Sequence, residues 1–156
     1  MNKGALLLDK KIIGITLTYA IIMMSLILVT FIGEWNPSGY SYSLSNETLT
    51  IEKGLFSKET TEIAIEDRID QAISFSLSIS EENQQWRMDV IVIGLLLPFL
   101  LLLFVPDRRP FKKQLSYPWF ALIVAALVVL YASYSVPAHI TEISDIQNQV
   151  DRLVQE

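Results

Sequence analysis

Three long segments of the chain contain no charged side chain and are dominated by Leu, Ile, Val, Phe and Ala. They are residues 12–33, 90–106 and 117–136. An α-helix rises about 1.5 Å per residue, so about 20 apolar residues cross a hydrocarbon core of about 30 Å. The pattern therefore predicts three transmembrane helices.

A shorter period occupies the segment between the first two predicted spans. Residues 72–80 (AISFSLSIS) alternate apolar side chains with Ser, and residues 48–52, 61–65 and 40–44 alternate as well. A period of two is typical of half-buried strands. We therefore expect three or four antiparallel strands, whose apolar face comprises Leu49, Ile51, Ile63, Ile65, Phe75 and Leu77.

The C-terminal tail follows a helical period instead. Ile143, Ile146, Val150 and Leu153 recur at 3-4-3 spacing, which predicts an amphipathic helix. A single-layer sheet must cover its apolar face, and residues 34–89 contain no convincing helix of their own. The tail stripe could cover the sheet or could bind a partner helix, and we favour packing within the chain.

The predicted fold is therefore a membrane α-helical protein with a small extracytoplasmic antiparallel sheet. Its segments are a tail with the first span (1–33), a β-rich loop domain (34–89), the second span (90–106), a basic loop (107–116), the third span (117–136) and an amphipathic helix (137–156).

The charges predict an orientation in the cell membrane. Short segments rich in Lys and Arg stay in the cytoplasm. The loop 107–116 carries Arg108, Arg109, Lys112 and Lys113 against one acid, whereas residues 34–89 carry eleven acidic and four basic side chains. We expect a cytoplasmic N-terminus and an extracytoplasmic C-terminus. The four basic residues could also bind anionic lipid headgroups.

The residue inventory argues against chemistry within this chain. There is no Cys, and the only His, His139, is expected to be structural or solvated. No charged residue lies inside a predicted span, which disfavours a transporter or a proton channel. The acidic run at Glu59, Glu62, Glu66, Asp67 and Asp70 lacks calcium-loop spacing and is interpreted as a solvated face. We therefore predict no enzyme activity, no cofactor and no metal site. Asn46 opens an N-x-[ST] sequence whose glycosylation depends on the organism.

Small residues in the first and third spans suggest helix contacts. Gly14 with Thr18, and Ala121 with Ala125, have the small-xxx-small spacing that lets helix backbones approach closely. These pairs could pack within the three-helix unit or against another membrane subunit, and the sequence does not choose between the two.

Residues 48–70 resemble a segment of bacterial membrane-flanking PH-like domains. The matching positions are Leu49, Ile51, Gly54, Ile63, Ile65 and Ile69. The resemblance implies a strand, a Gly-containing turn and a second strand. That family usually places the segment on the cytoplasmic side, whereas the charge rule places it outside here. It implies no functional residue.

The functional expectation follows from these features. We expect a non-catalytic accessory subunit of a larger membrane complex, such as a respiratory, oxidase or monooxygenase assembly, with other integral membrane subunits as partners and no nucleic acid. Two alternatives remain open: a stand-alone envelope protein that binds or senses a ligand through its outer domain, and a small homo-oligomeric channel.

Overall fold

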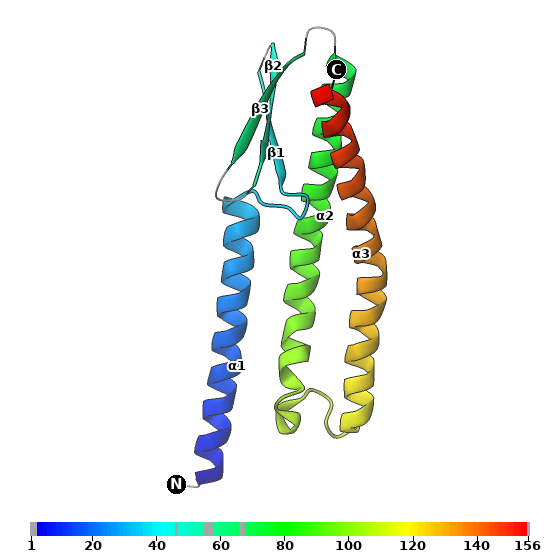
Figure 1. Ribbon diagram of the computed structural model, residues 1–156. Helices are drawn as coiled ribbons and strands as arrows, with labels where there is room; N and C mark the ends of the chain where they lie inside the picture. Colours follow the sequence, from blue (N-terminus) through cyan, green and yellow to red (C-terminus); the bar gives the residue numbers. More distant parts are fainter. Residues whose placement is uncertain (1–2, 46, 55–57, 66–67, 156) are drawn as a thin grey trace. The chain divides into compact units, whose positions relative to one another are not determined.

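The structure is a computed structural model that describes residues 3–45, 47–54, 58–65 and 68–155 (Figure 1). The chain divides into two compact units. We call them the helical unit, within residues 1–28 and 90–133, and the sheet unit, within residues 29–89 and 134–156.

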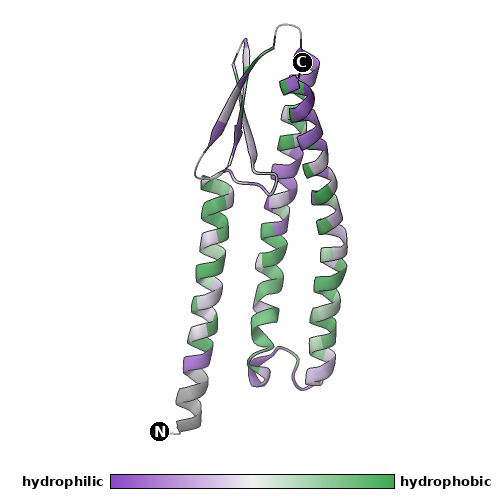
Figure 2. Ribbon diagram, in the orientation of Figure 1, coloured by the Kyte–Doolittle hydropathy of each residue, from purple (hydrophilic) through white to green (hydrophobic). Residues whose placement is uncertain are grey.

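Three helices among the described residues are long and apolar enough to cross a membrane. Helix α1 (Lys3–Ile27) continues into a π-helical turn at Leu28–Ile32, and the two others are α2 (Ile69–Leu102) and α3 (Tyr117–Gln155). Figure 2 shows the hydrophobic residues concentrated in most of α1 and in the parts of α2 and α3 nearest their connection, while the ends of α2 and α3 near the C-terminus are largely hydrophilic. The prediction of three long apolar helices is confirmed.

The second helix ends earlier than the apolar segment suggests. The sequence predicted a span to residue 106, but α2 ends at Leu102. Val105 has a non-helical backbone, with φ −132° and ψ 75°, and it precedes Pro106, whose ring disfavours helical backbone at the residue before it.

The predicted sheet has three strands in the described residues. Strands β1 (Tyr40–Leu44), β2 (Thr48–Lys53) and β3 (Glu59–Ala64) pair antiparallel in the order β1-β2-β3. Leu49 of β2 lies opposite Leu44 of β1 and Ile63 of β3. Because these partners share one face of the pleat, the register gathers the apolar side chains on a single side of the sheet.

The strand predicted over residues 72–80 is wrong, because these residues begin α2. Ala72, Phe75 and Ile79 are buried at spacings of three and four, whereas Ile73 and Leu77 are exposed. Phe75 and Ile79 fit both a period of two and a helical period. The serines between the apolar residues made the segment look like an alternating strand. The expectation that residues 34–89 lack a helix is therefore also wrong.

The core of the sheet unit lies between the sheet and the two helices. Ile146 and Leu153 of α3 are buried in one cluster with residues of the strands and of α2, and Val150 packs against it. The tail stripe thus covers the sheet from within the chain. The cluster comprises Tyr40, Leu49, Ile51, Ile63, Ile65, Ala72, Phe75, Ile79, Ile146 and Leu153.

The tail is not a helix of its own, as the predicted boundary at residue 137 implied. Helix α3 runs without a break through Pro137. The carbonyl of Pro137 accepts a hydrogen bond from the Thr141 hydroxyl at 3.0 Å, so the turn that follows the proline remains hydrogen-bonded.

Contact between α1 and α2 in the helical unit occurs at Gly94 and not at Gly14, while contact of Gly14 with another membrane subunit stays a prediction. A Cβ on Gly94 would lie 2.9 Å from the Met23 methyl carbon, and the Tyr19 hydroxyl donates to the Gly94 carbonyl at 3.3 Å. Among the described residues, no atom outside the local backbone of α1 lies within 4 Å of a Cβ placed on Gly14. Close approach of α1 and α2 therefore occurs at Gly94. Of the other predicted small residues, Thr18 and Ala125 are exposed and Ala121 is half-buried.

The basic connection between α2 and α3 uses one of its arginines for its own structure. The Arg109 guanidinium donates to the carbonyls of Pro106 and Leu115 at 2.7 and 3.3 Å and lies over the ring of Tyr117. Lys112 donates to the Asp107 carbonyl at 3.2 Å. Binding of anionic lipid at this loop stays a prediction.

Candidate functional site

A buried charged cluster joins α2 and α3 within the sheet unit. The Glu82 side chain is 0% exposed, and its Oε1 lies 2.7 Å from Nδ1 of His139. The other ring nitrogen of His139, Nε2, contacts the Asp89 carboxylate, which is also buried. A single imidazole is thus held between two carboxylates where α2 and α3 contact each other. We call these three residues the acid–histidine cluster.

Polar and aromatic neighbours fix the geometry of this cluster. The Ser135 hydroxyl donates to Oδ2 of Asp89 at 2.8 Å. The Trp86 ring meets His139 edge to face at 6.2 Å, and its N–H donates to the Thr30 hydroxyl at 2.9 Å. Trp35 in turn packs edge to face on Trp86 at 5.4 Å. These contacts limit the rotation of the imidazole.

The surroundings shift the proton affinity of three groups, all beyond the apolar segments 90–106 and 117–136. Burial raises the pKa of Glu82, and its hydrogen bond to His139 only partly opposes this. Burial lowers the pKa of His139, but hydrogen bonds to Asp89 and Glu82 outweigh it and raise the pKa above its usual value. Burial and the nearby charges of Glu81 and Asp145 raise the pKa of Glu142.

The arrangement can hold protons but does not have the geometry of a catalytic triad. Ser135, His139 and Asp89 are the residue types of a catalytic triad, yet the Ser135 hydroxyl donates to Asp89 and not to the imidazole. The serine–histidine hydrogen bond of a catalytic triad is therefore not formed. Among the described residues no group of three His, Cys, Asp or Glu side chains is arranged to hold a metal ion.

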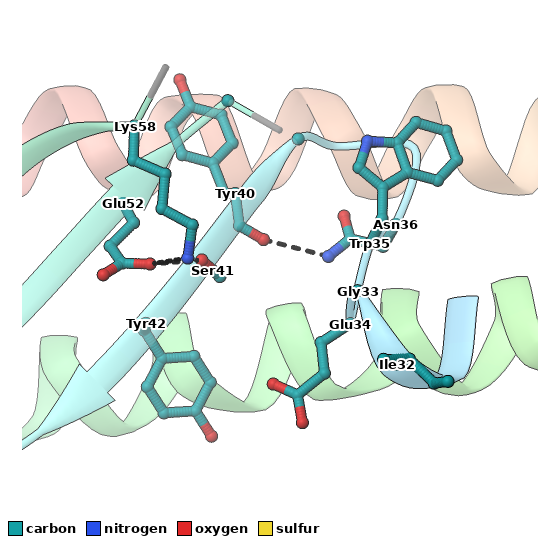
Figure 3. A pocket seen from close by; sticks show the side chains of 12 residues that line it. Ile32, Gly33, Glu34, Trp35, Asn36, Tyr40, Ser41, Tyr42, Glu52 and Lys58 are labelled. Carbon is teal, nitrogen blue, oxygen red and sulfur yellow. Dashed lines mark hydrogen bonds and ion pairs between the residues drawn. The ribbon is translucent and has the colours of Figure 1, made fainter. Parts of the chain in front are cut away.

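A second feature is a polar pocket of about 260 Å³ at the foot of the sheet. Figure 3 shows the ion pair of Lys58 with Glu52 on one side of the pocket and Trp35 with Asn36 on the other. The Lys58 ammonium lies 2.5 Å from the Glu52 carboxylate. Glu34 also lines the pocket and has a positive φ of 49°, which is uncommon for a residue with a side chain.

The loop before β1 is held by a buried asparagine. The Asn36 amide donates to the Tyr40 carbonyl and to Oδ1 of Asn83 on α2, each at 2.9 Å. Its Oδ1 accepts from the Ser38 backbone N–H at 3.0 Å. Gly33 permits the chain to turn here, because a Cβ at this position would lie 2.7 Å from the Val29 carbonyl oxygen.

A third feature is a row of exposed apolar side chains on α2. Ile69, Ile73 and Leu77 are 56%, 55% and 57% exposed. Their spacing of four residues places them one above another on α2, on a different side of the helix from the buried positions Phe75 and Ile79. We call these three residues the apolar ridge. Well before the apolar segment 90–106 begins, the chain thus presents a second apolar surface.

The structure places the sequence-predicted residues as follows. Ile146 and Leu153 are buried in the core, and Ile143 and Val150 are half-buried. Glu59, Glu62 and Asp70 of the acidic run are exposed, while Glu66, Asp67 and Asn46 lie outside the described residues. His139, expected to be structural or solvated, is half-buried between Glu82 and Asp89.

Sequence reasoning missed the acid–histidine cluster because it read residues 72–80 as a strand. Once α2 is a helix, Glu82 and Asp89 are seven residues apart on its buried face and continue the line of Ala72, Phe75 and Ile79. Two acids on an apolar helical stripe, with a single His on the stripe of α3, are the signal that could have found the cluster.

No protein-family model, curated protein or solved structure matches the chain. The local resemblance to PH-like domains therefore stays a prediction, and the functional argument depends on the residues themselves.

Proposed function

We propose that this chain is a non-catalytic accessory subunit of a larger membrane complex, and that the apolar ridge of α2 contacts a different membrane protein. The exposed ridge is the observation on which the proposal depends. The three apolar helices supply the anchor, and the sheet unit supplies the contact surface.

Among the described residues, the ridge is not needed to cover the sheet. The apolar face of the sheet is already covered by the buried side of α2 and by Ile146 and Leu153 of α3. Ile69, Ile73 and Leu77 point away from that core. Burying a Leu or Ile side chain is favourable by about 1.5–3 kcal/mol, so three exposed side chains in a row favour a partner that removes them from water.

The spacing of the ridge favours a helix as the partner element. Side chains at i, i+4 and i+8 form a ridge that fits the groove between the ridges of another helix, with the two axes crossing at about −50°. The partner would present an apolar groove of the same kind.

The charges beside the ridge favour a different protein over a second copy. Asp70 and Glu81 are exposed on the same helix. In a symmetric pair of parallel copies, one flank of the ridge faces the other flank of the copy, where Ser76 lies, so the two acids would find no basic partner there. A different protein with basic residues beside its groove would pair with them.

Co-purification tests the proposal. The full-length protein, with an N-terminal tag at native expression, is extracted in mild detergent as wild type, as Ile73→Ser/Leu77→Ser and as Ile140→Ser. Ile140 is a matched control, because it is an exposed Ile on α3. We expect a stoichiometric partner with the wild type and the control and its loss from the ridge variant. A lone monomer, a complex of identical copies, or a partner retained by the ridge variant would contradict the proposal.

A second function is favoured by the polar pocket. Its aromatic and charged lining at Trp35, Tyr42, Glu34 and Lys58 suits a small polar ligand, in which case the chain would be an envelope protein that binds or senses through its sheet unit. Glu34→Gln and Lys58→Gln would then weaken binding of that ligand, while Ile73→Ser/Leu77→Ser would not. A ligand that protects the wild type and both pocket variants equally against heat would exclude this function for the pocket.

A further inference from the structure

We propose that Glu82, His139 and Asp89 form a proton-binding site that sets how tightly α2 and α3 pack against each other in the sheet unit. The proposal is independent of the accessory-subunit function. It depends on three contacts between the two helices and on the burial of the groups that make them.

The net charge of the acid–histidine cluster depends on the imidazole proton. With the imidazole protonated, one cation lies between two carboxylates, and each N–H of the ring donates to one of them. When the imidazole loses its proton, only one ring N–H remains, so one carboxylate loses its donor. Two buried negative charges then face a neutral ring, and burial makes this arrangement costly.

Only one of the two carboxylate oxygens of Glu82 has a hydrogen-bond partner among the described residues. Its Oε1 contacts His139, but its Oε2 is buried without a hydrogen-bond partner among the described residues. An unpartnered buried carboxylate oxygen favours a proton on the carboxyl group, because the protonated form loses less on leaving water. The site therefore has room for a second proton beside the one on the imidazole.

Outside the cluster, the charges that act on Glu82 and on its neighbour Glu142 are acidic. Glu142 on α3 acts on Glu82, and Glu81 on α2 and Asp145 on α3 act on Glu142. The π-helical turn contributes only the neutral Thr30, through Trp86. The guanidinium of Arg87 lies over the Phe31 ring, 5.7 Å from its centroid. Every proton lost from the site therefore adds negative charge to a region that is already acidic.

The consequence is a helix pair that is held together most firmly when the site is protonated. Asp89, His139 and Glu82 occupy the seam where an apolar core would otherwise continue, so repulsion there acts directly on the distance between α2 and α3. A rise in pH would loosen this seam.

Nuclear magnetic resonance can observe the site directly. His139 is the only histidine, so a full-length protein with a histidine-free tag and isotope-labelled histidine gives one imidazole signal. In lipid nanodiscs we expect its titration midpoint above about 6.5, the value of an unperturbed imidazole. Asp89→Asn should lower the midpoint. Asp70→Asn, which removes an exposed acid from the same helix, should not. A midpoint at or below about 6.5 in the wild type overturns the site.

A distance measurement tests the coupling to packing. The chain has no Cys, so spin labels at Ser80→Cys on α2 and Gln147→Cys on α3, both exposed, report on this helix pair alone. We expect a narrow distance distribution at about pH 5.5 that broadens by about pH 9, and less broadening in Glu82→Gln, which leaves a single buried carboxylate. If Glu82→Gln does not fold, Asp89→Asn takes its place.

Two results would overturn the coupling. One is a wild-type distribution that is the same at both pH values although the imidazole titrates between them. The other is broadening in the neutralised variant that equals the broadening of the wild type and of Asp70→Asn.

Discussion

Replacing Ile146 by Ala tests whether the C-terminal part of α3 stabilises the sheet. Ile146 is 0% exposed and packs in the cluster that includes Leu49 and Ile51 of β2. Removing a fully buried Ile side chain to Ala costs about 2–5 kcal/mol, because the transfer energy and the new cavity add. Ile140 on the same helix is 63% exposed, so Ile140→Ala should cost less than about 0.5 kcal/mol.

Amide hydrogen exchange measures this difference locally. A loss of about 3 kcal/mol in the free energy of opening corresponds to exchange about 100-fold faster, since each 1.4 kcal/mol is a factor of about ten. The full-length protein in detergent micelles should show this acceleration at the β2 amides in Ile146→Ala and almost none in Ile140→Ala. Equal exchange in the two variants would refute the packing of α3 on the sheet as a source of its stability.

Four further predictions follow from other contacts. Gly33→Ala should destabilise the loop before β1 by about 1–3 kcal/mol and shift the Trp35 fluorescence, because the alanine Cβ would lie 2.7 Å from the Val29 carbonyl oxygen. Gly14→Ala is the control and should have no such effect, because no described atom outside the local backbone of α1 lies within 4 Å of a Cβ there. Deleting residues 140–156 should make residues 34–89 sensitive to protease, since Ile146 and Leu153 are lost from the core. Burial raises the pKa of Glu82 and of Glu142, and the flanking carboxylates raise the pKa of His139 despite burial. The contribution of these groups to the free energy of unfolding in urea should therefore be greatest below their unfolded-state pKa values and should fall as pH rises through their folded-state pKa values. A free energy of unfolding that rises from about pH 5 to 9 would contradict this sign. Reporter fusions after Lys113 and after Glu156 should report cytoplasmic and extracytoplasmic locations, and the reverse pattern would contradict the charge rule.

The sequence predicted the elements whose pattern has a single interpretation. Segments without charge predicted the three apolar helices, and the alternating residues 40–44 and 48–52 predicted β1 and β2. The tail stripe predicted a helix whose residues Ile146 and Leu153 are buried on the sheet. For the tail stripe and β2 a single period accounts for the buried positions, so local pattern and tertiary packing agree.

Residues 72–80 were misread because two periods fit the same apolar positions. Phe75 and Ile79 lie on successive turns of one helix face, but they would also lie on one face of a strand. Only the continuation of the pattern to Glu82 and Asp89, charged residues on the buried face, separates the two interpretations. Charged residues are seldom expected in a core, so the same misreading concealed both the helix and the cluster.

The pocket and the apolar ridge could not be predicted from the sequence, for a different reason. The pocket joins Trp35 and Glu34 to Lys58, which are separate in the sequence and are brought together by the sheet. The ridge becomes visible only after the buried face of α2 is known, because Ile73 and Leu77 are as apolar as the residues that form the core.

Photo-crosslinking from the ridge in native membranes tests the central claim most directly. A photoreactive residue replaces Ile73, Leu77 or, as the control, Ile140, which is also exposed. The account predicts that positions 73 and 77 form an adduct with one other membrane protein and that position 140 does not. Adducts only between copies of this chain, the same adduct from position 140, or none from positions 73 and 77 would contradict it.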